Sequence, residues 1–271
     1  MATPSPTTES TAPTAMKSLR SALRLLTEFT GGQPRYTVTE LATKTGLTMS
    51  HTSKIVAALC DAGLVTRDPG SQTFSIAVKS FVLGSQFFNH DQLSREALGV
   101  LRRLTEETRH STRLSVLDGD KVVYLIGVSG PLFLDSPWRM GTYLRMHSTS
   151  AGRVFLAFMD EAISTPLMRE LPLEAMTEST VTDRNEFQQL IVQVRQQGFA
   201  VSRGENTPNL AAIGVPVFDA ARRAVGVLSV TFPSHMVAKE EEPTLLVPLM
   251  RAASTLSQRL GCPVYPFGPL A

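Results

Sequence analysis

The sequence predicts an α+β protein with a small, mainly helical first part and a larger second part that mixes helices and strands. Between residues 37 and 76, two short helical segments surround a tight turn, and a two-stranded hairpin follows at once. From residue 113 to residue 260, β-rich segments alternate with amphipathic helical segments. That order favours an α+β sheet with its helices mostly on one side.

The first residues carry little information about the fold. Residues 1–14 are rich in Thr, Ser and Pro and almost free of apolar side chains. They cannot bury enough surface to offset their chain entropy, so we expect a disordered tail. An amphipathic helix is expected from about residue 15 to residue 29, and Gly31 and Pro34 end it.

The first half of residues 37–65 carries the end signals of two helices. Thr37 and Glu40 have the spacing of a capping box, in which each side chain bonds the backbone amide of the other residue. Gly46 fits the left-handed residue that closes a helix, and Thr48 is placed to cap the next one. The buried side of that second helix is predicted by apolar or small residues at three- and four-residue spacing, namely Thr52, Ile55, Val56 and Leu59.

The opposite side of the second helix has short hydroxyl side chains and one cation, and no acidic residue before Asp61. Such a face can enter a major groove without steric or charge conflict, and the alternative is a solvated face of a small helical domain. Residues 64–67 and 73–76 alternate in polarity around a turn at 68–72, which predicts the wing of a winged helix–turn–helix domain over residues 15–80. The candidate DNA-binding residues are Thr48, Ser50, His51, Ser53, Lys54 and Arg67.

The distribution of charge supports this prediction better than the total does. The formal net charge of the chain is only +2. Residues 15–80 contain eight lysines and arginines against four acidic residues, which gives +4 there and −2 in the remainder. A basic module on a slightly acidic body is expected when only one end of a protein meets DNA.

Other protein classes find little support in the sequence. The 271 residues can form two domains with cores of their own. No apolar run approaches the roughly 18 to 20 residues that span a bilayer, and the first residues lack the order of a signal peptide. Cys60 and Cys262 belong to no metal-like cluster. We therefore expect a cytoplasmic protein that is not associated with a membrane and binds no metal or cofactor.

The second part can be divided into its elements by the same signals. A linker helix is expected at residues 81–91 and the larger domain at residues 92–260, followed by a loose Pro-rich tail at 261–271. Asp118-Gly119-Asp120 between two β-rich segments is a strong hairpin signal. The further elements are helices at 92–109, from Ser148 or Thr149 to 158, at 160–170, 183–197 and 243–260, and strands at 113–117, 121–127, 199–202, 212–218 and 224–232.

Three segments resemble the IclR family of bacterial transcription regulators. They are TELATKTGLTMSHTSKIVAALCDAGLV, GTYLRMHSTSAGRVFLAF and GFAVSRGENTPNLAAIGVPVFDAARRAVGVLSVTFP. The resemblance covers about residues 15–260 and implies a GAF-like effector-binding domain behind the DNA-binding domain. It also implies three partners: a double-stranded DNA operator, a small-molecule effector, and further copies of the chain in dimers that often pair into tetramers. Repression is the commoner behaviour in the family.

The resemblance also implies, by position, a pocket for the effector. Ser150 and Ala151 fall in the first turns of a helix, where free amides favour an anion. Ser229 and Thr231 are two apart on one strand and share a face, although such hydroxyls also bond neighbouring backbone. The implied effector-binding residues are Ser136, Trp138, Leu144, Ser150, Ala151, Ser202, Leu210, Ala212, Ser229 and Thr231.

Departures from the family pattern bear on the ligand. Many members have an acidic residue at the position of Ser202, a glycine at Asn209 and a cysteine at Ala212. The pocket expected here is therefore less polar and less charged, which favours a larger or aromatic acid or amide over a very small oxo-acid. In the second helix many members have Arg at Lys54 and a basic residue at Met49, and Lys binds only as a point charge.

Two other functions stay open at this point. The first is an enzyme with a GAF-like hydrolase body, although the five histidines show no metal spacing and no Gly-x-Ser-x-Gly motif occurs. Ser148 beside His147 does not form a catalytic triad. The second is a DNA-binding protein that responds to no ligand, against which a ligand-induced rise in melting temperature would argue.

Overall fold

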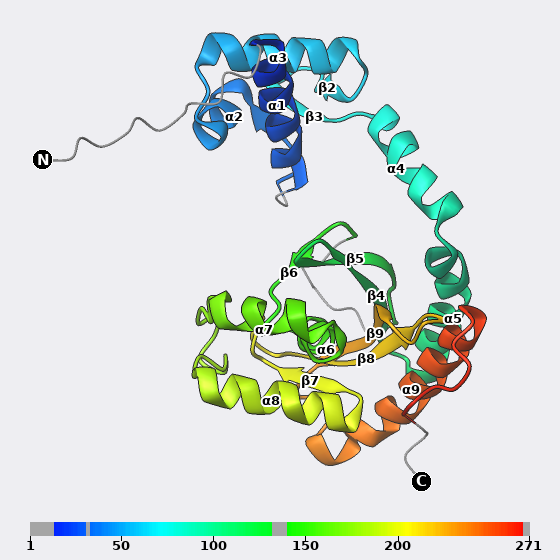
Figure 1. Cartoon of the computed structure of the whole chain (residues 1–271). Helices are drawn as coiled ribbons and strands as arrows, with labels where there is room; N and C mark the ends of the chain where they lie inside the picture. The colour runs from blue at the N-terminus through cyan, green and yellow to red at the C-terminus, as the bar shows by residue number, and fades with distance from the viewer. Residues whose placement is uncertain (1–13, 31–32, 132–139, 268–271) are drawn as a thin grey trace, which may run out of the picture. The chain divides into compact units, whose positions relative to one another are not determined.

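The computed structural model describes residues 14–30, 33–131 and 140–267 (Figure 1). The chain divides into two compact units, Met1–Phe87 and Phe88–Ala271. Apart from Thr14, the tail predicted at residues 1–14 lies outside the described residues. No helix in the described ranges is long and apolar enough to cross a bilayer.

The first unit has the helices and the hairpin that the sequence predicts. A further short strand, β1, pairs with β3 through Tyr36 and Phe74, so the sheet has the order β1-β3-β2. Two residues are too few for a pattern of alternation, and for this reason the sequence did not predict β1. The elements are α1 (Thr14–Thr27), η1 (Glu28–Thr30), β1 (Tyr36–Thr37), α2 (Val38–Thr45), α3 (Met49–Asp61), β2 (Val65–Arg67) and β3 (Thr73–Ile76).

The predicted end signals hold α2 and α3 in place. The Thr37 amide donates to the Glu40 carboxylate at 2.7 Å, and the Glu40 amide donates to the Thr37 hydroxyl at 3.2 Å. Gly46 ends α2 in the left-handed conformation, with φ 65°. Thr48 accepts a hydrogen bond from the His51 amide at 3.3 Å and so caps α3. These local bonds satisfy amides that the first turn of a helix leaves free.

The predicted apolar side of α3 forms the core of the first unit. Thr52, Ile55, Val56 and Leu59 are buried, and they meet Leu25 of α1 and Leu41 of α2. The helix α4 (Val78–His90) then follows the wing. The Lys79 ammonium donates to the Ala62 carbonyl at 2.8 Å, and this bond joins the start of α4 to the end of α3.

The second unit is built on one antiparallel sheet of six strands in the order β6-β5-β4-β9-β8-β7. The Asp-Gly signal is confirmed, because β4 and β5 form a hairpin and Gly119 has φ 62°. The strands are β4 (Ser111–Asp118), β5 (Lys121–Val128), β6 (Tyr143–Leu144), β7 (Ala200–Arg203), β8 (Leu210–Phe218) and β9 (Ala224–Pro233).

Helices cover both faces of this sheet, so the expectation of helices mostly on one side is wrong. One core lies between the sheet and the pair α5 and α9, and another lies between the sheet and the pair α6 and α8 (Figure 1). The reason can be read in β8 and β9, which are buried along almost their whole length, and not only on alternate residues. The helices are α5 (Gln92–Thr108), α6 (Ser150–Phe158), α7 (Glu161–Glu170), α8 (Arg184–Gln197), η2 (Lys239–Glu241) and α9 (Glu242–Arg259).

The segment after α9 is packed and not loose over residues 261–267. The Tyr265 hydroxyl donates to the Pro216 carbonyl at 2.9 Å. Burial raises the pKa of Tyr265 to a value far above its usual range. Phe267 lies against the rings of Phe158 and Phe218. The prediction from Pro content missed this packing because aromatic side chains anchor a chain without regular secondary structure.

Candidate DNA-binding face and effector cavity

The outer face of α3 presents the residues that the sequence assigns to DNA. Ser50, Ser53 and Lys54 are exposed, on the side opposite the buried Ile55. His51 is half-buried, and the Thr48 hydroxyl is engaged as the cap. The ion pairs found within the described part of the chain leave Lys54 out, so its charge is available to a phosphate.

The wing places its cation beside a neutral partner. The exposed Arg67 guanidinium donates to the Gln72 amide oxygen within the hairpin. Asp68 holds the turn, because its carboxylate accepts from the Thr73 and Ser75 hydroxyls at 3.0 and 3.2 Å. Arg67 can exchange Gln72 for a phosphate oxygen without leaving a charge unpaired.

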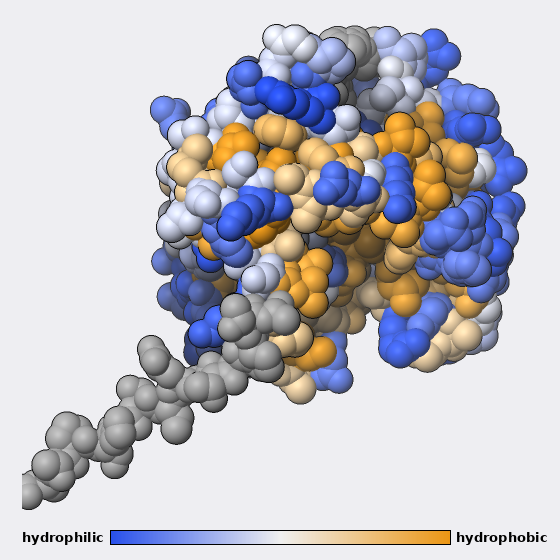
Figure 2. Space-filling model, turned by 90° about the horizontal axis from the view of Figure 1, so that it is seen from above, coloured by the Kyte–Doolittle hydropathy of each residue, from blue (hydrophilic) through white to orange (hydrophobic). Residues whose placement is uncertain are grey.

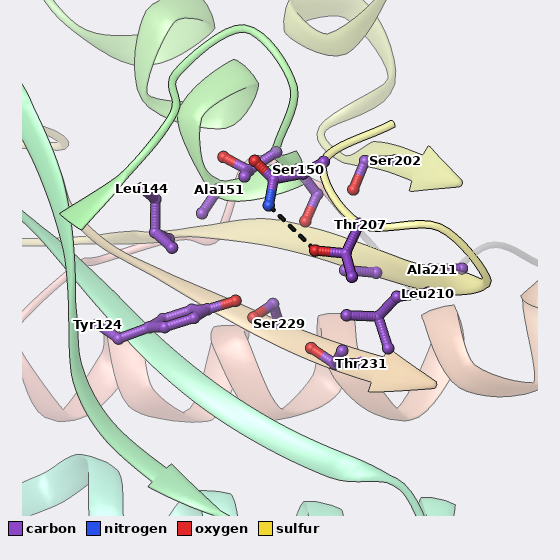
Figure 3. Close-up of a pocket in the computed structure, with 13 residues that line it drawn as sticks. Tyr124, Leu144, Ser150, Ala151, Ser202, Thr207, Leu210, Ala211, Ser229 and Thr231 are labelled. Carbon is purple, nitrogen blue, oxygen red and sulfur yellow. Dashed lines mark hydrogen bonds between the residues drawn. The ribbon is translucent and has the colours of Figure 1, made fainter. Parts of the chain in front are cut away.

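The second unit contains a cavity at the place where the implied effector residues meet (Figure 3). Its walls come from the first turn of α6 on one side and from the sheet on the other. Eight of the ten implied residues line it, and Ser136 and Trp138 lie outside the described residues. The lining is formed by Tyr124, Leu144, Thr149, Ser150, Ala151, Ser202, Asn206, Thr207, Leu210, Ala211, Ala212, Ser229 and Thr231.

The start of α6 gives the cavity an electropositive wall. Thr149 caps this helix, and its hydroxyl accepts from the Gly152 amide at 3.2 Å. The amides of Ser150 and Ala151 belong to the first turn and have no partner inside the helix. Together with the helix dipole they favour a negatively charged or strongly accepting group.

The sheet wall carries buried hydroxyls. Ser229 and Thr231 are each 2% exposed. The Thr231 hydroxyl lies beside the Tyr124 phenol, and the Ser229 hydroxyl has no hydrogen-bond partner among the residues that the structure describes. An unpaired buried hydroxyl costs about 1–3 kcal/mol, so the Ser229 hydroxyl favours a polar ligand in the cavity. The cavity measures about 30 Å³, which is enough for water but far below the several hundred Å³ of sites that hold larger ligands. A larger ligand therefore requires the walls to move apart.

Tyr124 is a cavity residue that the sequence did not predict. Burial raises the pKa of its phenol, while the nearby Arg113 guanidinium and Thr231 hydroxyl oppose that shift. Its position on β5 follows from the hairpin register, in which Tyr124 pairs with Ser115 across a bulge. Tyr in a β-rich segment is commonplace, so the sequence offered no signal for this role.

A buried ion pair supports the cavity from behind, and it too was not predicted. Arg153 of α6 and Glu205, on the loop after β7, are 2% and 9% exposed. The Arg153 Nη1 donates to the Glu205 carboxylate at 2.9 Å and the second nitrogen makes a parallel contact. Arg153 also donates to the carbonyls of His147 and Val201 at 2.9 and 3.2 Å. The loop that contributes Asn206 and Thr207 is thereby joined to α6.

Ser148 and His147, which directly precede the Thr149 cap of α6, do not have the geometry of a hydrolase dyad. The Ser148 hydroxyl donates to the Asn206 side chain at 2.9 Å, and the Nε2 of His147 lies 2.9 Å from the Glu174 carbonyl. The two side chains are therefore engaged elsewhere and form no dyad. Burial lowers the pKa of His147. No group of three His, Cys, Asp or Glu side chains that could hold a metal occurs in the described ranges.

A winged helix–turn–helix unit joined to a unit with a polar internal cavity defines a DNA-binding transcription regulator that responds to an effector. Residues 18–69 match the family described as "IclR helix-turn-helix domain" and residues 86–258 match "Bacterial transcriptional regulator IclR C-terminal". The chain belongs to the IclR family of bacterial transcriptional regulators. It is a regulator and not an enzyme, which removes the hydrolase alternative.

Individual relatives cover most of the chain. The transcriptional regulator KdgR of Escherichia coli (strain K12) is 28% identical over 230 residues, which is 85% of this chain and 88% of KdgR. The crystal structure of an IclR regulator from Alicyclobacillus acidocaldarius matches with a TM-score of 0.80 and 26% identity, covering 90% of this chain and 99% of that one. An IclR homologue from Microbacterium hydrocarbonoxydans, complexed with 4-hydroxybenzoate, has a TM-score of 0.78 and 22% identity, with 90% and 98% covered. The last likeness shows the fold alone.

Proposed function

We propose that this chain is a cytoplasmic repressor whose effector binds in the cavity between α6 and the sheet. The observation that carries the proposal is the buried Ser229 hydroxyl, which has no partner in the described part of the chain and faces the first turn of α6. In the proposed mechanism the bound ligand separates these walls, and α4 and α5 transmit the change to the DNA-binding unit. A ligand-independent DNA-binding protein has no use for such a cavity.

We propose an aromatic acid or amide as the effector. The described lining contains hydroxyl, amide and aliphatic side chains and no charged side chain among them, so in this proposal the amides of α6 hold the acid group. The complex of the M. hydrocarbonoxydans homologue with 4-hydroxybenzoate agrees with this class. Calorimetric titration should show tighter binding of aromatic acids or amides than of glyoxylate or pyruvate, and the reverse order would contradict the proposed class.

The DNA-binding part of the proposal places α3 of two copies in successive major grooves of a pseudo-palindromic site. Ser50, Ser53 and Lys54 face the bases and phosphates, and Arg67 meets the backbone beside them. In a run-off transcription assay on a promoter beside an operator selected from genomic fragments, the protein should lower transcript yield, and the effector should restore it. A higher transcript yield on adding the protein would indicate activation and contradict the proposed repression.

Lys54→Ala tests the proposed reading face. Loss of one phosphate contact should weaken binding to an operator selected from genomic fragments and reduce the slope of log K against log salt by about 0.9. Gel-shift titrations at several salt concentrations measure both quantities. Lys121→Ala, which removes a cation from β5 in the second unit, is the control and should leave the slope as it is; equal slopes for wild type and Lys54→Ala would refute the contact.

The proposed homodimer, which can pair further into a tetramer, rests on apolar faces of α1 and α4. On α4, Val78, Phe81 and Leu83 are 78%, 73% and 58% exposed, and on α1 Leu19 and Leu23 are exposed as well. On the viewed surface in Figure 2, hydrophobic residues in orange lie exposed among hydrophilic ones in blue. Exposed apolar groups of this size favour burial against a second copy.

Phe81→Glu tests the proposed association. A buried charge in an apolar interface is costly, so we expect the sedimentation coefficient to fall toward that of a monomer at micromolar concentration. Gln86→Glu adds the same charge elsewhere on α4 and should leave the assembly intact. An unchanged sedimentation profile for Phe81→Glu would place the interface elsewhere.

A further inference from the structure

An arginine stands beside the Tyr124 ring at the sheet wall of the cavity. Tyr124 is 8% exposed, and the guanidinium carbon of Arg113 lies 5.5 Å from the centroid of its ring. Arg113 takes part in none of the ion pairs within the described ranges. A half-buried positive charge therefore lies next to a cavity, and the lining residues that the structure describes include no charged side chain.

The sheet leaves room for this guanidinium. Arg113 on β4 pairs with Gly127 on β5 and with Ser229 on β9. A Cβ at Gly127 would lie 2.5 Å from the Nη1 of Arg113, so any side chain there would displace the guanidinium. A glycine inside a strand often marks such a close approach. The position of Arg113 beside Tyr124 thus depends on the absence of a side chain at Gly127 of the neighbouring strand.

The charge of Arg113 changes what the Tyr124 hydroxyl can do. A cation beside a phenol favours the ionised form, and the same effect makes the neutral hydroxyl a stronger hydrogen-bond donor. Figure 3 shows the hydroxyl end of Tyr124 directed toward Ser229, on the wall opposite Ser150 and Ala151. The cavity therefore has two polar ends, with amides at α6 and hydroxyls at the sheet.

We propose that Tyr124, supported by Arg113, selects effectors that carry a second oxygen at the end remote from the acid or amide group, as hydroxy-substituted aromatic acids do. This inference rests on the proposed function and adds the residues that recognise the second group. The Tyr124 hydroxyl donates to the ligand oxygen, and the ligand hydroxyl in turn gives Ser229 a partner. An acid without that oxygen leaves the Ser229 hydroxyl unpaired and binds more weakly.

Paired titrations of the full-length protein with 4-hydroxybenzoate and benzoate test this selection. Wild type should bind 4-hydroxybenzoate about 3- to 10-fold more tightly, the range expected for one to two hydrogen bonds. Tyr124→Phe keeps the ring and removes the donor, so it should bring the ratio of the two affinities close to one. Tyr143→Phe removes an exposed phenol of β6 that donates to Asp118, and this control should keep the wild-type ratio.

Arg113 is a positioning residue and needs a readout of its own. Arg113→Gln should lower the affinity ratio part of the way, and Arg113→Lys, which retains the charge, should recover part of the loss. Circular dichroism melting of each variant checks that it is folded. An unchanged ratio in Tyr124→Phe, or equal binding of the two acids by wild type, overturns the inference and leaves the proposed regulator intact. Failure of both acids to bind wild type overturns the aromatic ligand class, and the inference falls with it.

Discussion

Arg153→Ala is expected to destabilise the second unit by about 3–5 kcal/mol. The substitution leaves the Glu205 carboxylate, 9% exposed, without its partner. It also removes the donors to the carbonyls of His147 and Val201. Breaking one side of a buried ion pair is far more costly than deleting both sides, because the remaining charge is already desolvated. Urea unfolding of the full-length protein, followed by circular dichroism, measures the change in the free energy of unfolding.

Two further variants separate the buried pair from an ordinary surface one. Arg251→Ala removes an exposed pair with Glu107 and should change the free energy of unfolding by no more than about 1 kcal/mol. Arg153→Met combined with Glu205→Leu removes both charges and should recover part of the loss, the two carbonyls remaining without donors. A loss of less than 1 kcal/mol for Arg153→Ala would mean that water reaches Glu205, and the pair would not be the support proposed for the cavity.

This ion pair also shows where prediction from the sequence stops. Thr37 with Glu40, Gly46 and Thr48 are found from the sequence because each acts on backbone within four residues of itself. Arg153 and Glu205 are 52 residues apart, and no periodic pattern relates them. In the sequence, Glu205 is only one residue of the third segment that resembles the family. Its partner in α6 could be identified only from the structure.

The residues of the effector cavity also divide into those that the sequence predicts and those that only the structure reveals. Ser229 and Thr231 could be assigned to one face of a strand by their spacing alone, and the structure places both in the lining. Tyr124 became visible only through the register of the β4–β5 hairpin, which contains a bulge at Leu114 and Ser115. The volume of about 30 Å³ depends on packing between elements, which local sequence does not encode. The prediction of helices mostly on one side of the sheet was wrong, although the long apolar runs of β8 and β9 were present in the sequence.

Gly152→Ala is expected to give the second large effect, and it runs against helix propensity. Gly152 lies in the first turn of α6, and a Cβ there would stand 2.3 Å from both the Cα and the carbonyl oxygen of Met146. Alanine normally stabilises a helix interior by about 1 kcal/mol relative to glycine. Here the contacted atoms are backbone and cannot turn away, so α6 must move from the segment that precedes it. We expect a net loss of about 2–3 kcal/mol or more.

The displacement acts directly on the proposed effector site, because the same turn of α6 carries the Ser150 and Ala151 amides. Gly152→Ala should therefore abolish detectable binding of aromatic acids in calorimetry at temperatures where the variant is still folded. Gly99→Ala makes the same change in α5, where a Cβ meets nothing within 4 Å, and should raise the melting temperature and keep ligand binding. If both variants were stabilised alike, α6 would not pack against Met146 as closely as the cavity requires. The close approach of α6 to the turn at Met146 would then not explain the glycine at position 152, and the electropositive wall would have to be located again.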